Sequence, residues 1–107
     1  MKRQSNLNVL TPKQKAYLKS LAHPLKPCFQ IGKEGLSENL RIDLLNYLKK
    51  HELMKVSILN NSSVTLEEVE PFLSQVGIHL VQSIGHTLVL YKHSEDTKSP
   101  IVLPIKK

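Results

Sequence analysis

The clearest periodicity in the chain is helical and lies between residues 36 and 51. Apolar side chains recur there every three or four positions, as on one face of a helix: Leu36, Leu40, Leu44, Tyr47 and Leu48. Ser37 is a candidate N-cap, because its hydroxyl can accept a hydrogen bond from the first turn. The pattern predicts a helix that begins after Ser37 and reaches about His51.

A second helix is predicted near the N-terminus. Thr11 can cap it, Pro12 suits the first helical position, and Gln14 can complete a capping box. The apolar positions nearby would form its buried stripe: Leu10, Tyr17, Leu18 and Leu21. We expect this helix to run to about Ala22, because two prolines follow soon afterwards.

A third helix is predicted after residue 65. Thr65-x-x-Glu68 has the form of another capping box and predicts a helix to about Val76. Pro71 falls inside this helix, where it removes a hydrogen bond, so we expect a kink or a split there. Gly77 suits the position that ends the last turn.

Short β-type runs lie between and after the helices: residues 28–31, 54–58, 79–84 and 87–91. Gly85 and His86 separate the last two runs and fit a tight hairpin. Helices between the early strands require parallel or mixed pairing, whereas a hairpin is antiparallel. The chain is therefore expected to form an α/β fold, a four-stranded mixed sheet backed by helices, in the order α-β-α-β-α-β-β.

Length and composition fit one small domain. A chain of 107 residues can bury one modest core, and 40% hydrophobic residues is too many for a disordered chain. The longest apolar runs are only a few residues, and neither a membrane span nor a secretory signal is recognisable. A single cysteine fits a reducing compartment. We expect a cytoplasmic monomer with a flexible basic N-terminus at 1–9, a domain at 10–92 and a polar tail at 93–107.

The basic residues are concentrated at the start of the chain. The formal net charge is +6, and the basic residues before the first acidic one are Lys2, Arg3, Lys13, Lys15, Lys19, Lys26 and Lys33. Acidic residues outnumber basic ones between residues 34 and 91. A polyanion gains attraction and releases counterions mainly along such a basic surface, which favours nucleic acid as the partner. Charge alone fits a solvated lysine-rich surface equally well.

Patterns of enzymes and metal sites are absent from the sequence. The five histidines and Cys28 lack ligand spacing, and no nucleophile elbow, P-loop or dinucleotide-binding fingerprint is present. Glu67, Glu68 and Glu70 fit the start of a helix, whose dipole favours negative charge, better than an acid–base pair. Cys28 has apolar neighbours and is expected to be a small core residue. The sequence therefore predicts no enzyme, no cofactor and no small-molecule substrate.

The positive signal is the segment Gly32-Lys33-Glu34-Gly35, between a predicted strand and a predicted helix. Two glycines let the backbone come close to a phosphate, and the first N–H groups of the next helix attract anions. Lys33 adds positive charge, and KH-type modules clamp a nucleic-acid backbone with a G-x-x-G loop of this kind. A plain strand-to-helix turn also needs two glycines, and Glu34 opposes phosphate binding, so both interpretations stay open.

Four segments closely resemble the CRM domain family, whose bacterial single-domain members are the YhbY-type proteins: LAHPLKP at 21–27, QIGKEGLS at 30–37, HELMKV at 51–56 and IGHTLVLYK at 84–92. The likeness covers residues 10–92. It implies a fold similar to the C-terminal domain of bacterial translation initiation factor three, and association with precursors of the large ribosomal subunit. Pro71, Glu34 and Lys92 depart from the pattern, the last where an arginine is common.

These observations lead to the hypothesis that RNA lies across one surface formed by the first helix and the turn at 32–35. The candidate RNA-binding residues are Lys13, Lys15, Lys19, His23, Lys26, Gly32, Lys33, Glu34, Gly35 and Arg41. The lysines would neutralise phosphates and the glycines would allow close approach, as the resemblance also implies for the turn. Arg41 would extend the track, and His23 would either contact RNA or serve only the turn.

Recognition is expected to depend on RNA shape and backbone, because the tyrosines and phenylalanines are expected to be mostly buried. The alternative to RNA is a protein partner. In that case the tail would dock on ribosomal proteins or assembly factors through residues 101–103, which could otherwise lie along a sheet edge.

Overall fold

The computed structural model describes residues 10–94 and residue 101, and its order of elements is the predicted one. The helices and strands are α1 (Pro12–Ala22), β1 (Phe29–Ile31), α2 (Glu38–His51), β2 (Leu53–Ile58), α3 (Leu66–Ser74), β3 (His79–Ile84) and β4 (Thr87–Tyr91). The predicted flexible N-terminus and most of the predicted tail lie outside the described residues.

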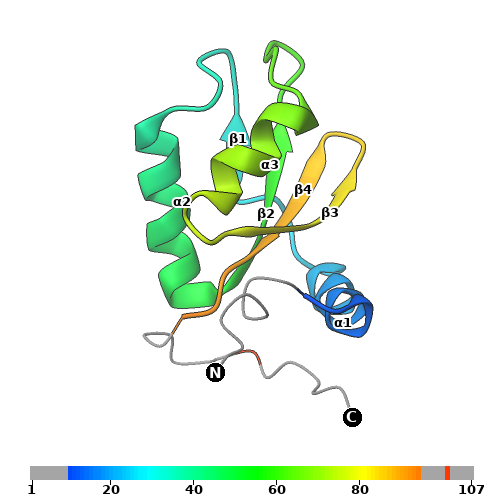
Figure 1. The fold of residues 1–107 in the computed structure, drawn as a ribbon. Helices are drawn as coiled ribbons and strands as arrows, with labels where there is room; N and C mark the ends of the chain where they lie inside the picture. Colours follow the sequence, from blue (N-terminus) through cyan, green and yellow to red (C-terminus); the bar gives the residue numbers. More distant parts are fainter. Residues whose placement is uncertain (1–9, 95–100, 102–107) are drawn as a thin grey trace.

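The sheet is four-stranded and mixed, as predicted. Its strand order is β1-β2-β4-β3, with β1 parallel to β2 and the other two pairings antiparallel. Because β1 and β2 are parallel, the chain leaves both at the same end of the sheet, where the β3–β4 hairpin also lies (Figure 1). We call this the turn end, because it carries residues 32–35. Leu53 pairs with Tyr91 at the opposite end.

The sheet has a separate core on each face. Under α2 and α3 the buried residues are Ile31, Leu44, Leu48, Met54, Val56, Ile58, Val69, Leu73, Ile78, Leu88 and Leu90. Under α1 they are Leu10, Leu18, Ala22, Leu53, Val81, Val89 and Tyr91. Successive residues of β4 alternate between these two groups, as side chains of a strand alternate between faces. Thus α1 covers one face of the sheet, and α2 and α3 cover the other.

The predicted capping residues begin their helices. Gln14 N–H donates to Thr11 Oγ1 at 3.1 Å, and Thr11 N–H donates back to Gln14 Oε1 at 3.0 Å. Ser37 Oγ accepts from Leu40 N–H at 3.1 Å, and Glu68 Oε1 accepts from Thr65 N–H at 3.2 Å. These bonds satisfy N–H groups that a helix start otherwise leaves unpaired.

The third helix runs unbroken through Pro71, so the expected split is wrong. Pro71 has no N–H, so the carbonyl of Glu67, four residues earlier, loses its hydrogen-bond donor within the helix. Both residues are exposed, and water can replace the missing bond. The helix ends at Ser74, two residues earlier than expected. Gly77 takes a φ of 80° just beyond it, and Ile78 N–H donates to Leu73 O at 3.0 Å, which is the αL ending predicted for this glycine.

Two predicted core residues are exposed. Tyr17 lies on α1 but is 39% exposed, so the buried stripe of that helix is narrower than expected. Cys28 is also exposed, and it lies just before β1, the strand at the edge of the sheet. Its N–H donates to Lys55 O at 3.0 Å.

The only described residue of the tail beyond Ser94 is Ile101. Its N–H donates to a carboxylate oxygen of Glu52, and its side chain packs against the core under α1. Ile101 does not belong to a strand, and residues 102 and 103 lie outside the described part. Among the described residues, no helix has the length and apolar character needed to cross a bilayer.

Candidate nucleic-acid interface

The predicted G-x-x-G segment forms a tight turn at the end of β1. Gly35 N–H donates to Gly32 O at 3.0 Å, and Gly35 has a φ of 70°, a conformation that favours glycine. A Cβ on Gly35 would also lie 3.3 Å from Val64 Cγ2, in the loop before α3. Lys33 and Glu34 are exposed at its tip. The turn is therefore accessible to a ligand, and the chain there requires glycine at 35 for its own folding.

The surroundings of this turn are acidic. The carboxylates at the turn end, on the turn itself, in the first two turns of α2 and in the first turn of α3, are Glu34, Glu38, Asp43, Glu67 and Glu68. The nearest basic side chains are Lys33 and Arg41. A phosphate placed here would meet like charges, which weakens the attraction from Lys33 and from the start of α2.

Arg41 is engaged within the fold. Its guanidinium donates to Glu38 Oε2 at 2.9 Å, to Phe72 O at 3.2 Å and to Gln75 Oε1 at 3.1 Å. It also lies 4.3 Å from the centre of the Phe72 ring, and its side chain is only 17% exposed. Arg41 thus ties α2 to α3, and its predicted contact with RNA would have to replace these bonds.

The lysines of α1 lie far from the turn. Lys13, Lys15 and Lys19 are exposed on a helix that packs over the opposite end of the sheet, on the face away from α2 and α3 (Figure 1). The expectation of one continuous surface joining α1 to the turn is therefore wrong. The physical reason is that β1 runs away from α1 along the sheet edge and carries Lys33 to the other end.

A different group of cations lies at the end of the sheet opposite the turn, and it comes from five separate segments of the chain. We call it the basic end, and its lysines are Lys13, Lys15, Lys19, Lys26, Lys49, Lys50, Lys55 and Lys92. Lys49 and Lys50 are in the last turn of α2, and Lys92 follows β4. Among residues 10–94, two carboxylates lie close to this group: Glu52, which is fully buried, and Glu70, which lines a cavity with Lys15.

The segment between α1 and β1 is held against β2 by a lysine. Lys55 Nζ donates to His23 O at 3.3 Å and to Leu25 O at 2.9 Å. His23 and Lys26 themselves are exposed. The backbone of His23 therefore serves the turn after α1, and its side chain stays accessible beside Lys26.

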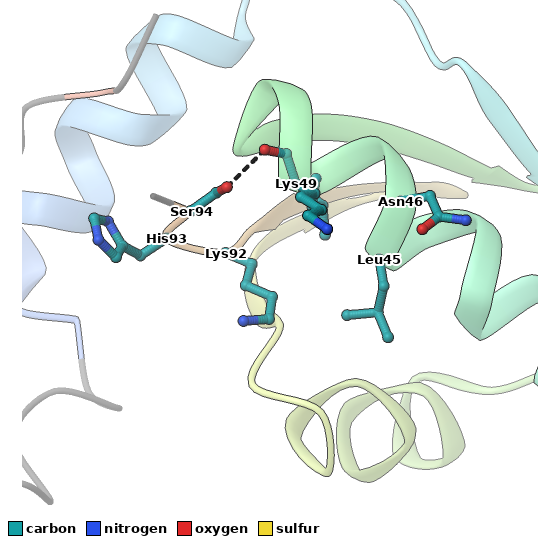
Figure 2. Close-up of a pocket in the computed structure, with 7 residues that line it drawn as sticks. Leu45, Asn46, Lys49, Lys92, His93 and Ser94 are labelled. Atoms are coloured by element: carbon teal, nitrogen blue, oxygen red, sulfur yellow. Dashed lines mark hydrogen bonds between the residues drawn. The ribbon is translucent and has the colours of Figure 1, made fainter. Parts of the chain in front are cut away.

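Buried Glu52 fixes the segment that carries Lys92. Its carboxylate accepts from Ser94 N–H at 2.7 Å and from Ile101 N–H at 2.6 Å, and His93 Nδ1 lies 3.4 Å away. Ser94 Oγ donates to Lys49 O at 2.6 Å, so residues 92–94 run beside the last turn of α2 (Figure 2). Lys49 and Lys92 consequently line one cavity of about 410 Å³. Burial, and then the charge of Glu52, raise the pKa of Tyr91 to about 12.

The positive charge of the basic end acts on His79, at the start of β3. Burial lowers the pKa of His79, and the positive charges of Lys15 and Lys92 lower it further. Both effects disfavour the imidazolium, the first by removing water and the second by repulsion. Two lysines from distant parts of the sequence therefore act on one site.

Occupation of this region by phosphate should raise the pKa of His79. A nearby polyanion offsets the repulsion from Lys15 and Lys92 and stabilises the imidazolium. We expect the NMR titration of the His79 ring protons to move to higher pH when RNA is added. The exposed His86 in the β3–β4 hairpin is the control and should move less. An unchanged or lowered His79 pKa in the complex would place the phosphates elsewhere.

Comparison with known proteins identifies the domain. The model of the CRS1 / YhbY (CRM) domain matches residues 10–92. The chain belongs to the CRM domain family. The chain is 43% identical to "Probable RNA-binding protein YqeI" of Bacillus subtilis over 90% of its own length and 100% of that protein. It is 39% identical to an "RNA-binding protein" of Haemophilus influenzae, covering 94% and 100% of the two chains.

A solved structure has the same fold. The solution structure of the hypothetical protein SAV1595 from Staphylococcus aureus superposes with a TM-score of 0.68 and 38% identity, over 90% of this chain and 100% of that chain. A more distant relative is "CRS2-associated factor 1, mitochondrial" of rice, which is 29% identical over 87% of this chain and only 23% of its own length.

The structure divides the predicted RNA-binding residues of this CRM domain into two groups. Lys13, Lys15, Lys19, His23 and Lys26 lie at the basic end, and Gly32, Lys33, Glu34, Gly35 and Arg41 lie at the turn end. Sequence reasoning missed Lys49, Lys50, Lys55 and Lys92. Each lies outside the basic N-terminal segment of the sequence and joins the basic end only through the fold. No local pattern would have found them.

Proposed function

We propose that this CRM domain binds RNA, and that the basic end receives most of the phosphate contacts. The observation that carries the proposal is the convergence of lysines from α1, the 23–28 segment, the end of α2, the start of β2 and the residue after β4. Condensed counterions released from RNA by such a cluster favour binding with little dependence on base sequence. The names of the bacterial relatives as RNA-binding proteins support the proposal that this chain binds RNA.

The RNA in this proposal is ribosomal RNA in precursors of the large subunit, bound in the cytoplasm during ribosome assembly. Support comes from the resemblance of the chain to the YhbY-type members of the family. The proposed role is binding, with no catalytic step assigned to the chain.

The turn at 32–35 has a secondary role in this proposal. Lys26 and Lys33 are seven residues apart on a largely extended segment, so their Cα atoms are separated by at most about 25 Å. A KH-type clamp holds about four nucleotides. An RNA strand that leaves the basic end along β1 could therefore reach the turn, where Gly32 and Gly35 allow close approach of the phosphate backbone.

The direct test is to crosslink RNA to the protein in cells and to sequence the attached fragments. We expect fragments of large-subunit ribosomal RNA, including sequences that are removed from mature ribosomes. Co-sedimentation with ribosomal particles should be lost after nuclease treatment. Association that survives removal of the RNA would instead support docking on ribosomal proteins or assembly factors.

A further inference from the structure

Resting on the proposed RNA-binding function, we propose that a cavity at the basic end receives one unstacked nucleobase of single-stranded RNA. The cavity has a volume of about 300 Å³ and lies between the end of α1, the 23–28 segment, the end of α2 and the start of β2. This volume is at the lower limit for small-molecule sites, so it suits one planar ring system. The site would add base contacts to an interface otherwise made of phosphate contacts.

The walls of the cavity are mostly apolar. Aliphatic side chains line it from several elements: Leu21, Leu25, Leu53, Met54 and Ile101. Leu25 is held in place because Lys55 Nζ binds the Leu25 carbonyl, and Cys28 N–H binds Lys55 O. The wall formed by the 23–28 segment is thus fixed to β2 before any ligand arrives. A preformed apolar cavity beside a cationic surface fits the base and the phosphate of a nucleotide at once.

Aromatic rings form the remaining side. Tyr47 and His51 are four residues apart on α2, and their ring centres are 4.2 Å apart with an angle of 30° between the planes. Phe29 makes an edge-on contact with Tyr47, with the two ring centres 5.6 Å apart. His51 is the exposed end of the row. A base in the cavity would extend the stack, which is how single-stranded RNA bases bind to aromatic and histidine side chains.

Polar groups at the mouth match the rest of a nucleotide. Lys26 is exposed and lines the cavity, where its ammonium can meet the phosphate attached to the bound base. The Tyr47 hydroxyl lies near the Cys28 thiol, and burial, followed by its interactions with Cys28, raises the pKa of Tyr47. Tyr47 therefore keeps its proton, and its hydroxyl oxygen can accept a hydrogen bond from a base edge. This mixture of aromatic rings, two lysines and a phenol suits a nucleotide.

The test measures binding of a single-stranded RNA of about eight nucleotides to the full chain and to variants. His51→Ala should weaken binding about tenfold, because one base–aromatic stack is lost. The slope of affinity against salt should stay unchanged, since stacking releases no counterions. His51→Phe should retain the affinity, and the matched control His86→Ala should bind like the unmodified protein.

RNAs that lack one base in turn complete the experiment. One abasic position should reproduce the loss seen with His51→Ala, and the two changes together should cost no more than either alone. The proposal is overturned if His51→Ala binds like the unmodified protein, or if losses from His51→Ala and from every abasic position are additive. Either result leaves the proposed function intact as long as charge reversals at the basic end abolish binding. Absence of RNA binding by the unmodified chain would instead remove the proposed function.

Discussion

The double variant Lys15→Glu with Lys19→Glu is expected to bind RNA about a hundredfold more weakly at low salt, because each reversal replaces an attraction of about 1 kcal/mol with a repulsion. Both side chains are exposed on α1, so the fold should persist. The slope of log affinity against log salt should fall by about two units, one for each lost phosphate contact. Fluorescence anisotropy over a series of salt concentrations measures both quantities.

The matched comparison uses single reversals, which change the net charge equally. Lys19→Glu lies at the basic end and Lys33→Glu at the turn end. We expect Lys19→Glu to lower RNA affinity more than Lys33→Glu, because carboxylates already surround Lys33. The reverse order would show that the turn is the main phosphate site. Circular dichroism of each variant checks that the helices are retained.

The second large effect concerns stability. Glu52→Ala is expected to lower the free energy of unfolding by about 3 kcal/mol, because Ser94 N–H and Ile101 N–H lose a charged acceptor. Glu52 is fully buried, so water does not easily replace the carboxylate. Urea denaturation monitored by circular dichroism measures the change. RNA affinity should fall as well, since the carboxylate holds the segment that carries Lys92.

Glu52→Gly separates the carboxylate from the backbone conformation at this position. Glu52 has a φ of 63°, which costs a non-glycine residue about 1 kcal/mol. The glycine variant should therefore be more stable than the alanine variant by about this amount, and still less stable than the unmodified protein. Equal stability of Glu52→Ala and the unmodified protein would contradict the role given to the carboxylate.

The local patterns of the sequence were sufficient for the elements and their order. Thr11, Ser37 and Thr65 precede their helices as expected, and the turn at 85 and 86 makes the last pairing antiparallel. A capping box involves residues three apart, so the sequence alone displays it. The boundary after Pro71 was less predictable, because exposure of the orphaned carbonyl decides whether a helix tolerates proline.

Long-range placement could not be derived in the same way. Which sheet face α1 covers depends on the packing of Leu18 and Ala22 against β2 and β4, and no local pattern encodes it. The proximity of Lys15 to Lys92 follows from that packing. The sequence around Glu52 does not indicate that its carboxylate is a buried hydrogen-bond acceptor, because its partners are more than 40 residues away in the chain. The contact between Tyr47 and His51 is easier to foresee from the sequence, since residues four apart on a helix are neighbours.

The most direct test of the central claim is a titration of RNA into isotope-labelled protein, followed by amide chemical shifts. We predict that the shifts concentrate in α1, residues 23–28, the last turn of α2, and Lys92 and His93, with smaller changes at residues 32–35. Shifts confined to residues 32–37 and to the loop before α3 would contradict the assignment of RNA phosphates to the basic end.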